Sequence, residues 1–351
     1  MSKGDWAATA LEASGLGALL RLRPRWRGVV ILNHHRVGDG TRWSTGRDVW
    51  SASAEQLDEQ LRFLSRNFDL VGPDDFLDAL GDTRSRAVAI TFDDGYRECH
   101  DVALPILQAH GVRAIFFLTT GFLDGARTAW WDEITWMVGN SSRATVPADG
   151  WLTSPVALDR ANQESAAAPL IAHYKTLPGD YSEDFLDYLA EATGSGRRDP
   201  TDSRDAWLDW DMVRELARSG MGIGGHTVTH PVLARHSGER QREQIVSSIE
   251  RIAEETGERP QFFSYPDGTP GSFDAETVRH VRDAGIRLAF SNYGGVAGAG
   301  DLDPFDVPRI PLGHKVTTRR FRAIVTLPVQ FASRGLRSDG SPLRPIPPAA
   351  H

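Results

Sequence analysis

Short apolar runs alternate with longer stretches in which apolar residues recur every three or four positions, from about residue 29 to residue 312. A short run followed by such a stretch is typical of a parallel β-sheet with helices outside it. Glycine ends several of the helical stretches directly before the next apolar run, for example Gly111 and Gly220, as it commonly ends helices. The pattern predicts an α/β fold, a distorted (β/α) barrel of about seven parallel strands, at 29–35, 87–92, 113–119, 221–226, 262–266, 288–292 and 307–312.

Helical patterns fill the intervals between these strands. Ser53 followed by Gln56 resembles a capping box at the start of the first helix. From residue 124 to residue 208 the alternation stops, and long segments that interrupt a compact fold are usually functional. We therefore predict a helical insertion at about 124–208 that forms one wall of a site. The predicted helices are 54–68, 97–110, 211–219, 239–256 and 274–284, with 130–138, 158–174 and 183–192 in the insertion.

Two basic, partly apolar segments flank the predicted barrel domain, which covers residues 29–314. Residues 1–28 form a basic amphipathic segment, and residues 315–351 combine a predicted helix with a Pro-rich tail. Such ends suggest a peripheral contact with anionic lipid. Arginine side chains also commonly cover the apolar surface of a barrel, so both interpretations stay open.

Composition narrows the class of protein. The chain has 351 residues, of which 40% are hydrophobic, enough for a proper core. Its formal net charge of −8 argues against a nucleic-acid partner, and its single cysteine, Cys99, excludes a disulfide framework and a cysteine-based zinc site. No stretch approaches the roughly 18 to 20 apolar residues of a membrane span. At the N-terminus the basic residues follow the apolar ones, the reverse of a secretory signal. We therefore expect a cytoplasmic protein, with membrane association as an option.

Polar residues gather where the predicted strands end. Asp93 and Asp94 follow one strand, whereas His226 ends another and His230 comes four residues later. The carboxyl ends of barrel strands meet at one mouth. Adjacent carboxylates repel and are costly to bury unless a cation binds them. One carboxylate and two imidazoles leave coordination positions for water and substrate, as in a hydrolytic zinc site. Asp-Gly is also an ordinary turn dipeptide, so the motif alone is weak evidence.

The combination of Thr-Phe-Asp-Asp-Gly at 91–95 with His-Thr-x-x-His at 226–230 resembles the polysaccharide deacetylase family, which is carbohydrate esterase family 4 or the NodB-homology family. The resemblance implies a metal-dependent hydrolase that removes N- or O-acetyl groups from a saccharide or glycolipid. Zinc is the metal we favour, and cobalt or nickel suits the same ligands. The resemblance assigns the roles: Asp93 as general base, Asp94, His226 and His230 as metal ligands, and the backbone N–H of Tyr96 as oxyanion donor.

The chain departs from the family pattern in two places. The third motif, Arg-x-Pro followed by an aromatic residue, is replaced by residues 263–268, so its arginine is absent and Asp267 stands at the aromatic position. Arg309 is our candidate for the missing guanidinium. The first strand resembles that of the circularly permuted branch, typified by poly-N-acetylglucosamine deacetylases, in which the acid histidine comes early. That likeness favours His35 as general acid, with His314 in Leu-Gly-His as the alternative.

The substrate side is less determined. Tyr265, Asp267 and Trp131 are candidate substrate-binding residues, because aromatic rings can stack on sugars and the first two lie at the end of the predicted strand 262–266. Two other functions stay open: a related amidohydrolase acting on small or cyclic amides, and a catalytically silent carbohydrate-binding relative. Intact Asp93 and Asp94 argue against the silent relative, since unused buried charges are expensive.

Overall fold

A parallel sheet forms the centre of the computed structural model, which describes residues 3–22, 26–40, 49–82, 86–159, 162–298 and 302–332. All seven predicted strands are present. The strands lie in the order β12-β11-β10-β9-β6-β5-β1-β13, and every pair along this path is parallel. Their bounds are β1 (Gly28–His34), β5 (Arg86–Phe92), β6 (Ile115–Leu118), β9 (Gly222–Gly225), β10 (Phe262–Ser264), β11 (Leu288–Ser291), β12 (Val307–Pro308) and β13 (Ile310–Pro311).

The two ends of this sheet belong to one stretch of chain. Only Arg309 separates β12 from β13, and β12 pairs with β11 while β13 pairs with β1. The sheet therefore nearly closes into a barrel, and the last predicted strand, 307–312, accounts for both labels. Among the described residues, five short strands fall outside the prediction. Two form a hairpin in the helical region described below. The other three are β4 (Asp69–Leu70), which pairs with β5, and the pair β2 (Arg36–Val37) and β3 (Trp50–Ala52).

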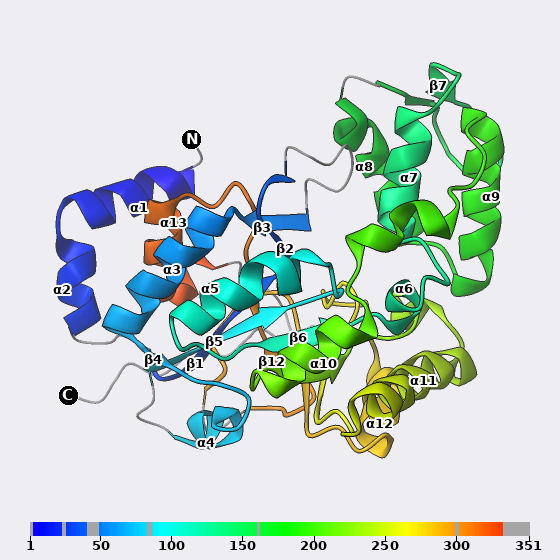
Figure 1. Cartoon of the computed structure of the whole chain (residues 1–351). Coiled ribbons are helices and arrows are strands. Elements are labelled where there is room, and N and C mark those ends of the chain that lie inside the picture. Colours follow the sequence, from blue (N-terminus) through cyan, green and yellow to red (C-terminus); the bar gives the residue numbers. More distant parts are fainter. Residues whose placement is uncertain are drawn as a thin grey trace.

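Helices surround the barrel (Figure 1). The capping box of Ser53 and Gln56 is confirmed at the start of α3. The predicted helix 97–110 is divided, because Pro105 has no N–H to donate at the junction between a π-helical turn, Cys99–Ala103, and α5. These helices are α3 (Ala54–Asn67), α4 (Phe76–Gly81), α5 (Leu104–Ala109), α6 (Thr120–Leu123), α10 (Trp210–Arg218), α11 (Gly238–Thr256) and α12 (Ala275–Asp283), with a 3₁₀ turn at Leu233–Arg235.

Side chains of β1 alternate between two apolar clusters. Val30 and Leu32 pack in the cluster that contains α3 residues, whereas Val29 and Ile31 pack with Phe117 and Phe290. Alternation continues to the end of the strand. It carries the next odd-numbered residues toward the inner side of the barrel, where the polar site begins.

Three helices beside the strand ends, α7, α8 and α9, pack around a hydrophobic cluster that is separate from those of the barrel. Its most buried members include Ile134, Leu170 and Phe185. Figure 1 shows them rising to one side of the barrel. One predicted start is wrong: the helix expected from residue 158 begins at Gln163, because residues 156–157 pair with the strand at 145–146 as a hairpin. The insertion boundaries at 124 and 208 stay a prediction. The elements are α7 (Trp130–Gly139), β7 (Thr145–Val146), β8 (Val156–Ala157), α8 (Gln163–Tyr174) and α9 (Ser182–Thr193), with 3₁₀ turns at Gly179–Tyr181 and Pro200–Ala206.

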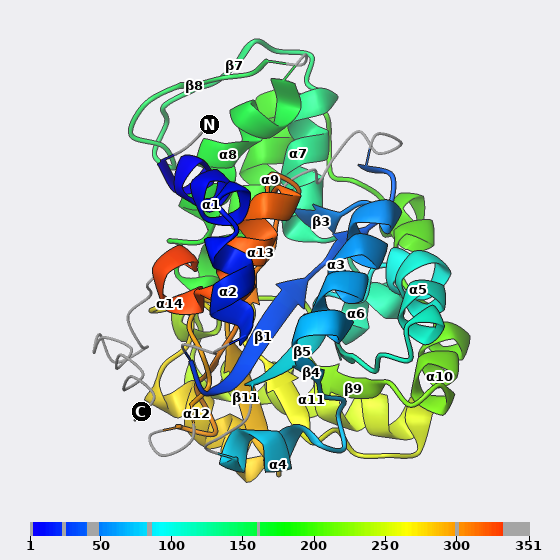
Figure 2. The same ribbon diagram turned by 90° about the vertical axis from the view of Figure 1, so that its left-hand side faces the viewer.

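The terminal helices lie together on another side of the barrel (Figure 2). α1 (Lys3–Ala13) and α2 (Leu16–Leu22) pack against α13 (Thr318–Thr326), which is followed by α14 (Pro328–Phe331). The Pro-rich tail of the sequence lies outside the described residues. Among the helices that are described, none is both long and apolar enough to cross a membrane.

Candidate metal centre and active site

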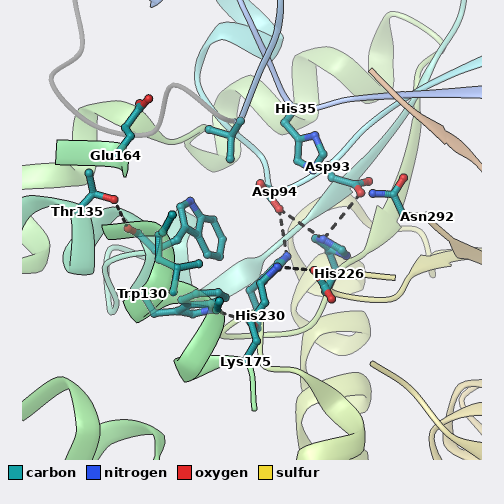
Figure 3. A pocket seen from close by; sticks show the side chains of 16 residues that line it. His35, Asp93, Asp94, Trp130, Thr135, Glu164, Lys175, His226, His230 and Asn292 are labelled. Atoms are coloured by element: carbon teal, nitrogen blue, oxygen red, sulfur yellow. Dashed lines mark hydrogen bonds and ion pairs between the residues drawn. The ribbon is translucent and has the colours of Figure 1, made fainter. Parts of the chain in front are cut away.

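Three side chains converge at the carboxyl ends of the strands. His226 Nε2 and His230 Nε2 each lie 3.4 Å from Asp94 Oδ1. Within the described part of the chain, this buried oxygen has no hydrogen-bond partner, and the three ligand atoms lie within 4.8 Å of one another. Figure 3 shows the three side chains pointing toward one point. An orphaned carboxylate oxygen facing two imidazole nitrogens fits a divalent cation.

The two histidines are prepared for ligation in different ways, since His230 Nδ1 has no hydrogen-bond partner among the described residues. His226 Nδ1 donates to the backbone oxygen of Ser264 at 2.7 Å, which leaves Nε2 with its lone pair toward Asp94. Burial lowers the pKa of His230 to about 3, so its ring is neutral at neutral pH, the form that binds metals. Burial alone would also lower the pKa of His226, but the carboxylates of Asp93 and Asp94 outweigh it and raise the pKa.

The loops that carry these residues have unusual backbone conformations. Among the described residues, four other than glycine have a left-handed φ: Asp94 at 75°, Thr227 at 68°, His230 at 55° and Asp267 at 62°. All four lie in the loops after β5, β9 and β10. Such conformations cost about 1–3 kcal/mol each and persist where surrounding contacts fix them, mostly at functional sites. Here the Thr227 hydroxyl accepts a hydrogen bond from the His230 N–H at 3.0 Å.

Asp93 is held differently from its neighbour Asp94. Both its oxygens are bound by Arg309, at 2.7 Å each, and Asn33 Nδ2 donates to Oδ2 at 2.9 Å. Burial raises the pKa of Asp93, but the guanidinium of Arg309 outweighs it and the pKa falls well below the ordinary value. Asp93 is therefore ionised at neutral pH, 4.0 Å from His226 Nε2 and without a place among the three converging ligands.

Arg309 comes from the stretch that joins the two ends of the sheet, and it is fully buried in the barrel. Besides Asp93 it donates to Asn33 Oδ1, Thr91 Oγ1, Ser264 Oγ and the backbone oxygen of Ser291. Ser264 stands two residues before Pro266, the position at which the family motif has arginine. The guanidinium that contacts Asp93 thus comes from a different strand than in the common pattern.

A stability prediction follows from this buried pair. Arg309→Met should lower the free energy of unfolding by about 3–5 kcal/mol, because Asp93 would stay buried without its partner. Adding Asp93→Asn to Arg309→Met should recover much of that loss, which urea unfolding would measure. As a control, Arg97→Met removes an exposed pair with Asp101 and should cost less than about 1 kcal/mol. Equal losses from Arg309→Met and Arg97→Met would contradict the interpretation.

A cavity of about 420 Å³ opens over these groups. Seven predicted site residues line it: Asp93, Asp94, His226, His230, His35, Asp267 and Trp131. Its opposite wall comes largely from α7 and α8. Trp130, Ala168 and Ile171 give this wall apolar surface, and Glu164 adds a carboxylate to it. The size is within the range of small-molecule pockets. The structure therefore joins the barrel residues and the helical region into one site.

Three predicted site residues lie elsewhere. Tyr265 is not at the pocket, because its ring stacks on Phe273 and its hydroxyl donates to a backbone oxygen, Phe305 O. His314 is exposed and is absent from the pocket lining. The side chain of Tyr96 is buried, with its hydroxyl bonded to Trp131 Nε1 at 3.0 Å, so only its backbone N–H remains a candidate for the oxyanion.

The two adjacent histidines of the first strand face opposite ways. His34 stacks on Phe92 and contacts Gln60 of α3, and burial lowers its pKa to about 4. His35 lines the pocket beside Asp93 and Asp94 (Figure 3). Strand alternation thus leaves His35 as the only one of the pair that reaches the site.

Sequence reasoning missed several residues of the site. Asn33, which bonds Asp93, lies two positions before His35, so alternation along β1 could have placed it on the same face. Lys175, at the C-terminal end of α8, pairs with Asp267 at 2.5 Å across the pocket. A charged residue at a helix end looks like an ordinary cap in the sequence, so Lys175 gave no signal.

Comparison with known proteins identifies the family of this chain. The family model for polysaccharide deacetylases matches residues 80–144 and 176–289, just over half of the chain. The chain belongs to the polysaccharide deacetylase family. No curated protein sequence matches it significantly. Asn33, His35 and Arg309 lie outside the matched residues, and so does α8 with Lys175.

Solved deacetylase structures share the fold. Streptococcus pyogenes PplD, in complex with acetate, superposes with a TM-score of 0.53 at 15% identity, covering 88% of this chain and 99% of that one. IcaB from Ammonifex degensii gives 0.52 at 18% identity, covering 86% and 97%. The BpsB deacetylase domain from Bordetella bronchiseptica gives 0.51 at 14% identity, covering 82% and 97%. At these identities the likeness concerns the fold.

Proposed function

We propose that this protein is a metal-dependent hydrolase that removes acetyl groups from amino sugars of a saccharide. The observation that carries the proposal is that the two neighbouring aspartates have different partners. Asp94 Oδ1 faces the imidazoles of His226 and His230, whereas Asp93 is held by Arg309 beside them. Membership of the deacetylase family supports the reaction class.

The three converging residues would hold a divalent cation, zinc foremost, with cobalt and nickel as alternatives. Bound there, such an ion supplies Lewis acidity toward the amide carbonyl and an incoming water. Asp93 accepts the proton of the attacking water. Arg309 keeps Asp93 ionised, and Asn33 fixes the carboxylate plane, so that the base is present in its active state and orientation.

Breaking the amide bond requires a proton on the leaving nitrogen, because an amine anion leaves poorly. His35 is the candidate acid, since it lines the same pocket as Asp93, whereas His314 does not. Its position on the first strand, ahead of the residues that the family model matches, supports assignment to the circularly permuted branch. The backbone N–H of Tyr96 is the proposed donor to the oxygen on which negative charge develops.

Acetate release would test this function. The purified chain, assayed with and without a chelator, would be given N-acetylated chito-oligosaccharides, O-acetylated oligosaccharides and small cyclic amides. We expect chelator-sensitive acetate release from the N-acetylated sugars. Turnover of the cyclic amides alone would replace the proposal by the amidohydrolase, and binding of sugar without any acetate release would replace it by the silent carbohydrate-binding protein.

The wall formed by α8 is the proposed source of substrate selection. Lys175 and Asp267 join this wall to the loop after β10, and a Thr269 hydroxyl holds the second oxygen of Asp267 at 2.6 Å. Both charged residues border the pocket that contains Asp94. They are therefore placed to contact sugar hydroxyls next to the reacting amide, and we propose that they bind substrate without taking part in the chemistry.

Lys175→Ala should raise KM by about ten-fold and leave kcat nearly unchanged, because it removes binding that substrate and transition state share. Steady-state acetate release over a range of substrate concentrations would measure both constants. Arg127→Ala provides the control, since Arg127 pairs with Glu183 in the same helical region but does not line the pocket. A fall in kcat at constant KM for Lys175→Ala would give Lys175 a role in the chemical step instead.

A further inference from the structure

The two ends of the sequence differ sharply in charge from the rest of the chain. Residues 1–27 contain five basic and two acidic residues, and residues 315–351 contain seven and one. These segments therefore carry a formal charge of +9, and the remainder carries −17 in a chain whose total is −8. Within these segments, the described residues 3–22 and 315–332 hold six basic and two acidic residues, and such a basic portion of an acidic protein suits an anionic partner.

The fold brings the described parts of these two segments together. Ala8 and Leu11 of α1 pack on Ala323 of α13, and Arg21 of α2 donates to Thr326 Oγ1 of α13 at 3.0 Å. Figures 1 and 2 both show α1 beside α13. Helices more than 300 residues apart in the sequence thus pack together. We call α1, α2, α13 and α14 the terminal helix group.

This group also exposes large apolar side chains. Five large hydrophobic residues are the most exposed of the described part of the chain, and four belong to α1 and α2: Trp6 at 69%, Leu16 at 47%, Leu19 at 63% and Leu22 at 78%. The three leucines recur every third residue, so they share one face of α2. Monomeric soluble proteins rarely gather exposed apolar residues in this way unless the surface binds something.

The same group of helices also carries exposed basic residues. Lys3 at the start of α1 is exposed, as are Lys315 and Arg319 before and within α13. Arg319 lies beside α1, because it lines one hollow together with Asp5 and Thr9 of α1, and Glu59 lines it as well. Tryptophan, leucine and exposed basic side chains in one region match the chemistry of a membrane interface with anionic headgroups.

Other occupants fit less well. A second copy of this chain, docked by the same surface about a twofold axis, would bring the basic residues of both copies into one interface, where the described residues of these segments hold too few acidic partners to match them. A nucleic acid would satisfy the basic residues but offers no apolar surface for Leu19 and Leu22. An anionic bilayer offers both negative charge and an acyl boundary.

We propose that the terminal helix group docks the protein on the surface of an anionic lipid bilayer. Leu16, Leu19, Leu22 and Trp6 enter the headgroup region, while Lys3, Lys315 and Arg319 contact the acidic headgroups. The proposal does not rest on the proposed deacetylase activity, since none of these residues lines the catalytic pocket. It would place any acetylated sugar carried by a membrane lipid near the enzyme.

Sedimentation of the full chain with vesicles would test the proposal. We expect binding to vesicles of phosphatidylcholine and phosphatidylserine in roughly equal parts, no binding to phosphatidylcholine alone, and weakening as salt rises. Leu19→Ser with Leu22→Ser should reduce binding by at least about ten-fold, and so should Lys315→Glu with Arg319→Glu. Tyr181→Ser is the matched control, because Tyr181, 52% exposed, lies on the helical region beside the strand ends.

Acetate release from a soluble sugar should stay unchanged in all these variants, which separates docking from catalysis. Absence of binding to the anionic vesicles at low salt would overturn the proposal. Binding that survives both double variants would also overturn it, because another surface would then be responsible. A third outcome would also overturn it. If the unaltered chain did not bind vesicles but formed a concentration-dependent dimer in light scattering, and the leucine variant abolished that dimer, the surface would be an interface between copies.

Discussion

Asp93→Asn should retain the metal and lose acetate release by about 10²–10⁴-fold, the usual contribution of a general base. Asparagine keeps the shape of aspartate but cannot accept the proton of the attacking water. The metal should stay, because Asp94, His226 and His230 are unchanged and Asp93 Oδ2 lies 4.0 Å from the nearest ligand nitrogen. Turnover and metal content, measured by mass spectrometry on the same purified sample, would test both parts of the prediction.

The substitution also leaves Arg309 buried without its counter-charge, so the unfolding transition must be measured beside the activity. Asp132→Asn is a suitable control, since Asp132 is a buried aspartate outside the pocket lining, with a pKa that burial raises to about 6. It should keep both metal and turnover. Near wild-type turnover in Asp93→Asn would remove Asp93 from the role of base, and loss of the metal would place it among the ligands.

The strands were predictable because local pattern and burial agree. β1 and β5 are buried on both faces, so their sequences read as continuous apolar runs followed at once by polar residues. The start of α8 was not predictable. Residues 156–157 pair with residues 145–146, and the Leu158 N–H continues this hairpin by donating to the backbone oxygen of Ala144. No periodicity within the segment from residue 158 indicates that its first residue belongs to a hairpin.

The site likewise has a part that could be predicted from the sequence and a part that could not. Asp94, His226 and His230 follow strands, and the shared edge of a parallel sheet is enough to predict their meeting. The contact between Arg309 and Asp93 depends on how the barrel closes, because Arg309 lies between β12 and β13, which pair at opposite ends of the sheet. The pairing of Lys175 with Asp267 depends on how α8 docks. Contacts of this kind are set by packing between distant segments, which no single motif records.

His226→Ala should lose both the metal and the activity. It removes one of the three proposed ligands together with that residue's hydrogen bond to the Ser264 carbonyl. Removing only the hydrogen-bond partner of a ligating histidine lowers metal affinity by up to about a hundred-fold. Removing the histidine itself should therefore lower metal affinity by more than that. Acetate release should fall with it. Metal titration monitored by the unfolding midpoint would measure affinity independently of turnover, because a ligand that binds only the folded state stabilises it.

The matched control is His314→Ala, which removes an exposed histidine outside the pocket and also tests the alternative general acid. It should keep the metal, the unfolding midpoint and the turnover of the unaltered chain. A His226→Ala protein that still gains stability from zinc at the original concentration would show that the cation binds without this ligand. A large loss of turnover in His314→Ala, with the metal and the unfolding midpoint retained, would assign the acid role to His314 instead of His35. The fold and the metal site would then be intact, and the missing function would be proton delivery to the leaving nitrogen.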